Sequence, residues 1–215
     1  MSTIVEKKPT KNRGGENSSR MAILKAASEE FALKGFAGAR TETIATLAGV
    51  KHTLVFYHFK TKDQLYSSVL ETLFSEWNDR VTQALDIEAS PKERLLAYID
   101  SYFNFIAEFP LSPKLVQQEQ MRQSSASADQ LHRMVERYIR PVHRKLVALL
   151  KEGVAVREFH DVDIEHCIHS ISALIIFYFT GSLTVESLEG AQVRPRRIEL
   201  RRKSVIDFIS RAIFS

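Results

Sequence analysis

The apolar residues of this chain recur at helical spacing along almost its whole length, and this periodicity constrains the fold more than any other feature. Near the N-terminus, for example, Met21, Leu24, Ala27 and Phe31 fall on one face of a helix with about 3.6 residues per turn. No segment shows the alternation of apolar and polar residues expected of a half-buried strand, and no internal repeat is present. The sequence therefore predicts an all-α protein of about nine or ten helices.

Turn and capping signals divide this pattern into separate helices. Gly35 ends the helix that starts at residue 19, Thr61 is placed to cap a long helix over 62–85, and Pro91 opens a helix over 91–109. Further helices are predicted at residues 41–48, 51–58, 114–122, 129–152, 161–180 and 196–213. A polar joint is expected at residues 124–128, and Pro141 predicts a kink or break in the helix that contains it.

Positive charge is concentrated at the N-terminal end of the chain. Residues 1–62 contain 11 Lys and Arg against 5 Asp and Glu, although the net charge of the whole chain is only +4. A basic front favours binding to a polyanion, with a solubilising tail as the alternative. Residues 1–18 are polar and are expected to form a disordered basic arm that either contacts DNA or remains an unordered tail. Its basic residues are Lys7, Lys8, Lys11 and Arg13.

Composition excludes several other classes of protein. The single cysteine, Cys167, rules out a disulfide framework and a Cys-rich zinc module. Residues 167–185 lack charge but contain polar residues, which favours a buried helix over a membrane span. His166 and His169 lie one helical turn apart without further ligands, so no metal site is expected. No phosphate loop, nucleophile elbow or carboxylate pair marks a catalytic site. We expect a cytoplasmic protein that is not an enzyme, needs no cofactor and does not associate with membranes.

The segment RTETIATLAGVKHTLVFYHFKTKDQL, residues 40–65, has the features of a helix-turn-helix. Such a motif needs small residues where its two helices cross, here Ala45 and Ala48, and a chain reversal, here Gly49 followed by the apolar anchor Val50. The second helix is short enough to present one polar face to a major groove. The pattern predicts a three-helix DNA-binding domain over residues 19–66 and a larger helical domain over 67–215.

This segment resembles the DNA-binding domain of TetR-family transcriptional regulators. The resemblance covers about residues 19–66 and departs from the family pattern at Lys51, where Ser is common, and at Phe56, where Tyr is common, so that the phosphate contact passes to Tyr57 or His58. It implies a dimeric regulator, most often a repressor, that a small-molecule effector releases from a palindromic operator. The matched positions are Thr41, Ile44, Ala45, Ala48, Gly49, Val50, Phe56, Tyr57, His58, Phe59, Lys62 and Leu65.

Ten residues of this domain are expected to contact DNA. Residues that begin the first short helix can meet phosphates, those that begin the second can reach base edges, and those near its end can clamp the backbone. Phe56 and Phe59 are expected in the core, whereas Leu54 or Val55 remains an alternative base contact. The expected contacts are Arg40, Thr41 and Thr43 to phosphates, Lys51, His52 and Thr53 to bases, and Tyr57, His58, Lys60 and Lys62 to the backbone.

The last two predicted helices are expected to form a four-helix interface between two copies of the chain. Burial of both helices within one chain is the alternative. The expected interface residues are Ile168, Ile171, Ile175, Val205, Phe208, Ile209 and Ile213.

An effector pocket is expected among the middle helices, where a polar side chain in apolar surroundings would mark a ligand site rather than ordinary core. The residues expected to line it are Trp77, Tyr102, Phe103, Gln118, Glu119, His166 and Tyr178. Residues 108–123 are faintly similar to the branch of the family that contains the pyrimidine-utilisation regulator. An effector is expected to change the separation of the two recognition helices through the long helix that starts at Lys62.

Overall fold

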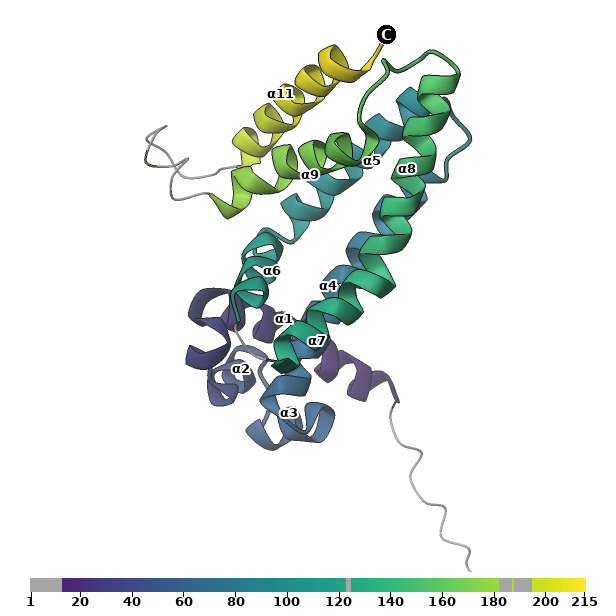
Figure 1. The fold of residues 1–215 in the computed structure, drawn as a ribbon. Coiled ribbons are helices and arrows are strands. Elements are labelled where there is room, and N and C mark those ends of the chain that lie inside the picture. Colours follow the sequence, from purple (N-terminus) through teal and green to yellow (C-terminus); the bar gives the residue numbers. More distant parts are fainter. Residues whose placement is uncertain (1–12, 123–124, 182–186, 188–194) are drawn as a thin grey trace, which may run out of the picture. The chain divides into compact units, whose positions relative to one another are not determined.

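The structure is a computed structural model that describes residues 13–122, 125–181, 187 and 195–215. Over these residues the chain folds into helices joined by short links (Figure 1), and the only β-type pairing among them is an isolated bridge between Phe159 and Phe214. The all-α prediction is confirmed. The chain divides into two compact units, residues 1–69 and residues 70–215, which we call the N-terminal and C-terminal units. No helix in the described part of the chain is long and apolar enough to cross a membrane.

The N-terminal unit is built from three helices and the first turns of a fourth. These are α1 (Arg13–Gly38), α2 (Thr41–Leu47), α3 (His52–Phe59) and the start of α4 (Lys62–Leu85). Phe31 and Tyr66 are fully buried at its centre, where their rings meet edge to face with centroids 4.8 Å apart. As predicted, Thr61 caps α4, because its hydroxyl oxygen accepts a hydrogen bond from the Gln64 N–H at 3.1 Å.

Helix α1 starts earlier than the sequence predicts, and it is interrupted near its C-terminal end. The prediction of a disordered arm is wrong for residues 13–18, which are helical, while residues 1–12 lie outside the described part of the chain. Contacts of Glu16 and Ser19 with α3 favour the additional turn. Gly35 interrupts the helix with φ 69° and ψ 171°, a conformation that essentially only glycine adopts. The predicted stop at Gly35 is therefore confirmed as a kink.

The C-terminal unit contains the rest of α4 and seven further helical elements with assigned bounds. Ser90 and Glu93 form a reciprocal capping box at the start of α5, where Pro91 takes the first helical position as predicted. The elements are α5 (Pro91–Glu108), α6 (Ser112–Met121), α7 (Ser125–Met134), the π-helix η1 (Val135–Ile139), α8 (Arg140–Ala155), α9 (Ile164–Thr180) and α11 (Pro195–Ile213).

The segment between α6 and α8 differs from the prediction at the start of α7 and just before Pro141. The predicted polar joint at residues 124–128 is wrong from Ser125 onwards, because α7 begins there and Ser127 is buried with its hydroxyl donating to the Glu119 carboxylate at 2.7 Å. At Pro141, where a kink or break is predicted, the helical backbone is not broken but changes to π-helical spacing just before the proline, with the Arg140 N–H bonded to the Val135 carbonyl.

Candidate DNA-contacting helix and ligand cavity

Helices α2 and α3 are joined by a tight turn at Gly49. Gly49 has φ 66°, in the left-handed region that glycine adopts without steric cost. Its N–H donates to the Thr46 carbonyl at 3.1 Å, and the N–H of Val50 donates to the carbonyl of the buried Ala45 at 3.0 Å. The small residues and the turn glycine thus occupy the places that a helix-turn-helix requires.

Helix α3 has an inner and an outer face. Val55 and Phe59 are buried on the inner face and attach the helix to the core. The prediction of a buried Phe56 is wrong, because 39% of this side chain is exposed and its ring lies edge-on to His52 at 5.0 Å. We call the exposed residues along α3 and its flanking positions the outer face: Lys51, Thr53, Phe56, Tyr57 and Lys60.

The residues expected to meet phosphates at the start of α2 have mixed environments. Thr41 is half-buried, and its hydroxyl lies 2.9 Å from His52 Nε2, which ties α2 to the start of α3. Thr43 is also half-buried. The side chain of Arg40 is exposed, while its backbone N–H donates to the Glu30 carboxylate at 3.2 Å. Arg40 is therefore the most accessible of the three.

The side chains of His58 and Lys62 contact residues of α1. His58 Nε2 lies 3.0 Å from the Ser19 hydroxyl on α1. The Lys62 ammonium donates to the Ala37 carbonyl at 3.3 Å and lies 4.9 Å from the ring centroid of Phe36. His58 thus helps to hold α1 against α3, and Lys62 helps to hold α1 against the start of α4.

Tyr57 is the hydroxyl-bearing aromatic on the outer face, and α1 supplies its partner. The hydroxyl donates to Glu16 Oε1 at 3.1 Å, and Lys60 donates to the Tyr57 carbonyl at 3.0 Å. Sequence reasoning missed Glu16, because the residue falls in a polar stretch without helical periodicity. The Glu16 carboxylate thus lies beside Tyr57, which is predicted to contact the DNA backbone.

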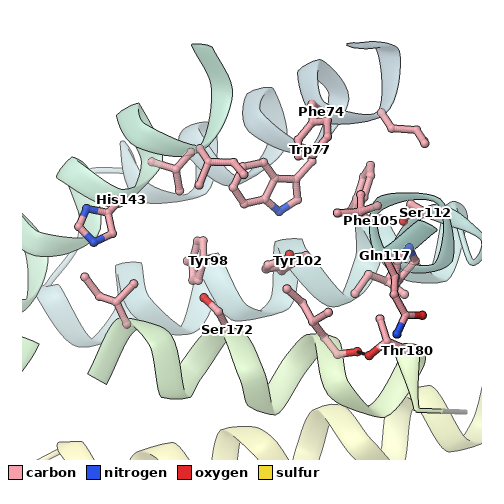
Figure 2. Close-up of a pocket in the computed structure, with 18 of the residues that line it drawn as sticks. Phe74, Trp77, Tyr98, Tyr102, Phe105, Ser112, Gln117, His143, Ser172 and Thr180 are labelled. Carbon is pink, nitrogen blue, oxygen red and sulfur yellow. Dashed lines mark hydrogen bonds between the residues drawn. The ribbon is translucent and has the colours of Figure 1, made fainter. Parts of the chain in front are cut away.

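The C-terminal unit encloses a cavity of about 400 Å³, within the range of roughly 300–1,000 Å³ that is typical of small-molecule sites. Helices α4, α5, α6, α8 and α9 and the π-helix all contribute to its wall. Aliphatic and aromatic side chains line the cavity, and Figure 2 labels the aromatic ones. These are Phe74, Trp77, Tyr98, Tyr102 and Phe105.

Trp77 and Tyr102 are the two predicted pocket residues that line this cavity. The other five predicted residues, Phe103, Gln118, Glu119, His166 and Tyr178, are not part of its wall. Glu119 is buried but binds Arg122 and Ser127 instead, and Phe103 is buried against Phe179 with a ring separation of 6.0 Å.

Most of these differences concern which side of a helix faces the cavity. On α6 the cavity is lined by Gln117 and Gln120 instead of Gln118 and Glu119. On α9 it is lined by His169 in place of His166, together with Ser172, whose side chain hydrogen-bonds to Tyr98. Burial raises the pKa of the Tyr98 and Tyr102 hydroxyls well above the ordinary tyrosine value, so both remain neutral.

Six of the seven residues predicted at the dimer interface belong to the core of a single chain. Ile168, Ile171, Ile175, Val205, Ile209 and Ile213 are each at most 5% exposed. The alternative of burial within one chain holds for them. Arg201 and Arg202 help to fasten α11, because they donate to the Leu174 carbonyl at 2.8 Å and to Asn104 at 2.6 Å.

Helices α9 and α11 lie side by side (Figure 1), and each exposes large apolar side chains. Phe177 on α9 is 66% exposed, and Leu200 and Phe208 on α11 are 58% and 60% exposed. We call these three residues the apolar α9–α11 face. Phe208 is the one predicted interface residue that belongs to it.

The described part of the chain contains no cluster of three or more His, Cys, Asp and Glu side chains that could hold a metal ion. His166 is exposed and His169 lies at the cavity wall, so the two histidines are not directed to a common ligand set.

The arrangement of α1, α2 and α3, with basic residues on the outer face of α3, is that of the helix-turn-helix class of DNA-binding proteins. In this chain a second helical unit follows it. Residues 23–69 match the model of the bacterial regulatory proteins of the tetR family, and residues 91–209 match that of the tetracyclin repressor-like C-terminal domain. The chain belongs to the TetR family of transcriptional regulators.

Individual relatives agree with this assignment. The HTH-type transcriptional repressor NicS of Pseudomonas putida is 29% identical over 171 residues, which cover 77% of each chain. The HTH-type transcriptional regulator RutR of Escherichia coli is 28% identical over 178 residues, which cover 83% of this chain and 82% of RutR.

Solved structures share the fold. The TetR family regulator PfmR from Thermus thermophilus has a TM-score of 0.71 at 18% identity, covering 88% of this chain and 97% of its own. The ketosteroid transcriptional regulator KstR2 of Mycobacterium tuberculosis has a TM-score of 0.70 at 20% identity, covering 93% and 96%.

Proposed function

We propose that this protein is a homodimeric repressor that binds a palindromic operator and is released from it by a small-molecule effector. The DNA-binding part of this proposal rests on the observation that α3 has one buried face and one exposed face. Val55 and Phe59 hold the helix against the core, which leaves the outer face free to enter a major groove. A repressor role is supported by the relative NicS, which carries that name.

The outer face offers two kinds of contact to DNA. Lys51 and Thr53 lie at the start of α3, the part of a recognition helix that reaches base edges, and the exposed Phe56 can meet a thymine methyl group. Tyr57 and Lys60 lie near its end and are placed to bind phosphates, which fixes the orientation of the helix on the duplex.

The apolar α9–α11 face supports the proposal of a homodimer. Two neighbouring helices that expose Phe177, Leu200 and Phe208 can pair with the same helices of a second copy around a two-fold axis and form a four-helix interface. A two-fold dimer presents two recognition helices to half-sites about 34–36 Å apart, which explains why we expect a palindromic operator.

Helix α4 supplies the proposed route from effector to DNA. Its residues Phe74 and Trp77 form part of the cavity wall, and the same helix begins at Lys62, two residues after Lys60, the residue that caps the end of α3. An effector that binds better to one orientation of α4 shifts the population towards the corresponding separation of the recognition helices. We expect that separation to fit the operator poorly.

The experiment that tests this function selects bound duplexes from a random DNA pool with the purified protein. We expect enrichment of a palindrome. On the enriched duplex, Lys51→Ala and Tyr57→Ala should each lower affinity about tenfold, because each removes one base or phosphate contact. Lys151→Ala, which removes a positive charge from exposed α8 surface, is the matched control and should have little effect.

Two results would contradict the proposal. One is the absence of any enriched sequence. The other is an enriched sequence that the Lys51 and Tyr57 variants bind as tightly as the unaltered protein does, since the outer face of α3 would then not be the DNA-reading surface.

Glu16→Gln is expected to raise DNA affinity about threefold at low salt, with a smaller gain at high salt. The variant keeps an oxygen that can accept the Tyr57 hydroxyl but removes a negative charge from beside the proposed phosphate contact. Fluorescence anisotropy with the enriched duplex over a range of salt concentrations measures the effect. Glu29→Gln, also at an exposed position of α1, is the control for net charge. Equal gains in both variants would show that the position of Glu16 is irrelevant.

A further inference from the structure

The cavity wall carries no formal charge of its own. Among the described residues that line it there is no Asp, Glu, Lys or Arg. Its two histidines, His143 and His169, are the only basic side chains among these residues, and His143 already faces a carboxylate, with 2.9 Å between its Nε2 and Glu165 Oε2. A charged ligand would lose its hydration in this cavity without gaining a counter-charge, which makes its binding unfavourable.

Three aromatic rings of the wall contact one another at tilted or edge-to-face angles. The centroids of Trp77 and Tyr102 are 5.5 Å apart with 58° between the ring planes, and those of Tyr98 and Tyr102 are 6.1 Å apart at 71°. These rings do not stack face to face, so parts of their faces remain available to a ligand. Such walls favour burial of an apolar or aromatic surface.

One polar group in this apolar wall has no partner. The Trp77 side chain is 8% exposed, and its Nε1–H finds no hydrogen-bond acceptor among the described residues. Figure 2 shows the indole nitrogen directed into the space between α4 and Tyr102. A buried donor without an acceptor is unfavourable and uncommon in native proteins, and a ligand oxygen or ring nitrogen would satisfy it.

Neutral polar side chains are gathered at one end of the cavity. Ser112, Gln117 and Thr180 lie together at the end formed by α6 and the end of α9 (Figure 2). Their hydroxyl and amide groups can bind a second polar group of a ligand but carry no formal counter-charge.

From these observations we propose that the effector is an uncharged, mainly apolar molecule that accepts a hydrogen bond from Trp77 Nε1. This inference rests on the proposed function of the cavity as the effector site, and it adds the chemical class of the ligand. The absence of charge selects against ions, the aromatic wall favours apolar surface, and the unpaired indole N–H fixes the place of one acceptor.

The test uses three probes of nearly equal shape: 2-acetylnaphthalene, which is neutral and carries an acceptor, 2-isopropylnaphthalene, which lacks the acceptor, and 2-naphthoate, which is an anion. Isothermal titration calorimetry measures their affinities for the full-length protein. We expect the acetyl compound to bind about tenfold more tightly than the isopropyl compound, and at least about tenfold more tightly than the carboxylate.

Two variants locate the hydrogen bond. Trp77→Phe keeps an aromatic ring but removes the donor, so the preference for the acetyl over the isopropyl compound should disappear. Phe74→Leu, the matched control, alters the same wall of α4 but leaves Trp77 intact. It should weaken both compounds to a similar degree and preserve the preference.

Three results would overturn the inference: 2-naphthoate binding as tightly as 2-acetylnaphthalene, an unchanged preference in Trp77→Phe, or no binding of any probe. These results are separate from the proposed regulatory function, which is tested on DNA. If 2-acetylnaphthalene binds as expected but the affinity for the enriched duplex stays the same, the ligand class holds and the release mechanism fails.

Discussion

Replacing both Phe177 and Phe208 by Asp is expected to convert the protein into a monomer and to weaken operator binding about a hundredfold or more. Each phenylalanine leaves about two-thirds of its side chain exposed in a single chain, at 66% and 60%. Burying a large apolar side chain contributes about 1.5–3 kcal/mol, and a symmetric interface contains each residue twice. Aspartate in the same place would put unpaired charges into the interface.

The loss of DNA affinity follows from the loss of the second half-site. In a dimer, binding of one recognition helix holds the other close to its own half-site, whereas a monomer binds each half-site independently. Sedimentation equilibrium measures the oligomeric state and fluorescence anisotropy measures the affinity for the enriched duplex. Circular dichroism shows that the variant is folded, as expected for changes at exposed positions.

A matched control makes the same change elsewhere on the surface. Met121 on α6 is 70% exposed and lies outside the apolar α9–α11 face. Met121→Asp should therefore leave the dimer and its operator affinity intact. A double variant at Phe177 and Phe208 that remained dimeric and bound the operator normally would show that this face is not the interface.

The elements of the fold could be predicted well from the sequence, because local signals mark them. The long helix α4 has the predicted bounds, since Thr61 supplies a cap and the apolar repeat continues to Leu85. The turn at Gly49 was recognisable for the same reason, as a glycine between two short apolar patterns is typical of a helix-turn-helix. Such signals act over a few residues and need no knowledge of tertiary packing.

The residues of the cavity and of the apolar α9–α11 face were harder to predict, because they depend on which side of a helix faces which neighbour. On α9 and α11 the most apolar stripe packs against the chain's own core, as Ile175 and Ile209 show with at most 1% exposure. The exposed face is a weaker stripe that includes Phe177 and Phe208. Periodicity identifies the buried side of a helix but not whether the same chain or a second copy covers it.

Tertiary contacts explain the other differences. Glu16 lies in a sequence with little apolar periodicity, yet its carboxylate accepts the Tyr57 hydroxyl from 41 residues along the chain. Helix α8 also continues past residue 152, the predicted end of the helix, through Gly153 to Ala155. The reason for a glycine at this position is a ring that packs directly against it.

Gly153→Ala is expected to lower the free energy of unfolding by about 3 kcal/mol. A Cβ atom at this position would lie 2.1 Å from Cδ2 of the Phe159 ring, far inside van der Waals contact. The ring has little freedom to move away, because Phe159 is buried and stacks on Phe214 with centroids 5.5 Å apart. Urea denaturation at a fixed protein concentration measures the change, since the proposed dimerisation would add to the stability in a concentration-dependent way.

The expected loss also reaches the C-terminal helix. The segment after α8 holds the end of α11 through two backbone hydrogen bonds, from the His160 N–H to the Ile213 carbonyl at 2.8 Å and from the Ser215 N–H to the Glu158 carbonyl at 3.0 Å. Displacement of Phe159 would strain both bonds. We therefore expect a weaker dimer as well as a less stable fold.

A double-mutant cycle separates the clash from the general effect of replacing glycine in a helix. In a Phe159→Ala background the ring is absent, so Gly153→Ala should be neutral or stabilising by about 0.5–1 kcal/mol, because alanine has the higher helix propensity. Gly38→Ala, where a Cβ would meet only Lys34 Cβ at an ordinary 3.5 Å, is the matched control and should also be tolerated. If Gly153→Ala destabilised both backgrounds equally, contact with Phe159 would not be the reason for glycine at this position.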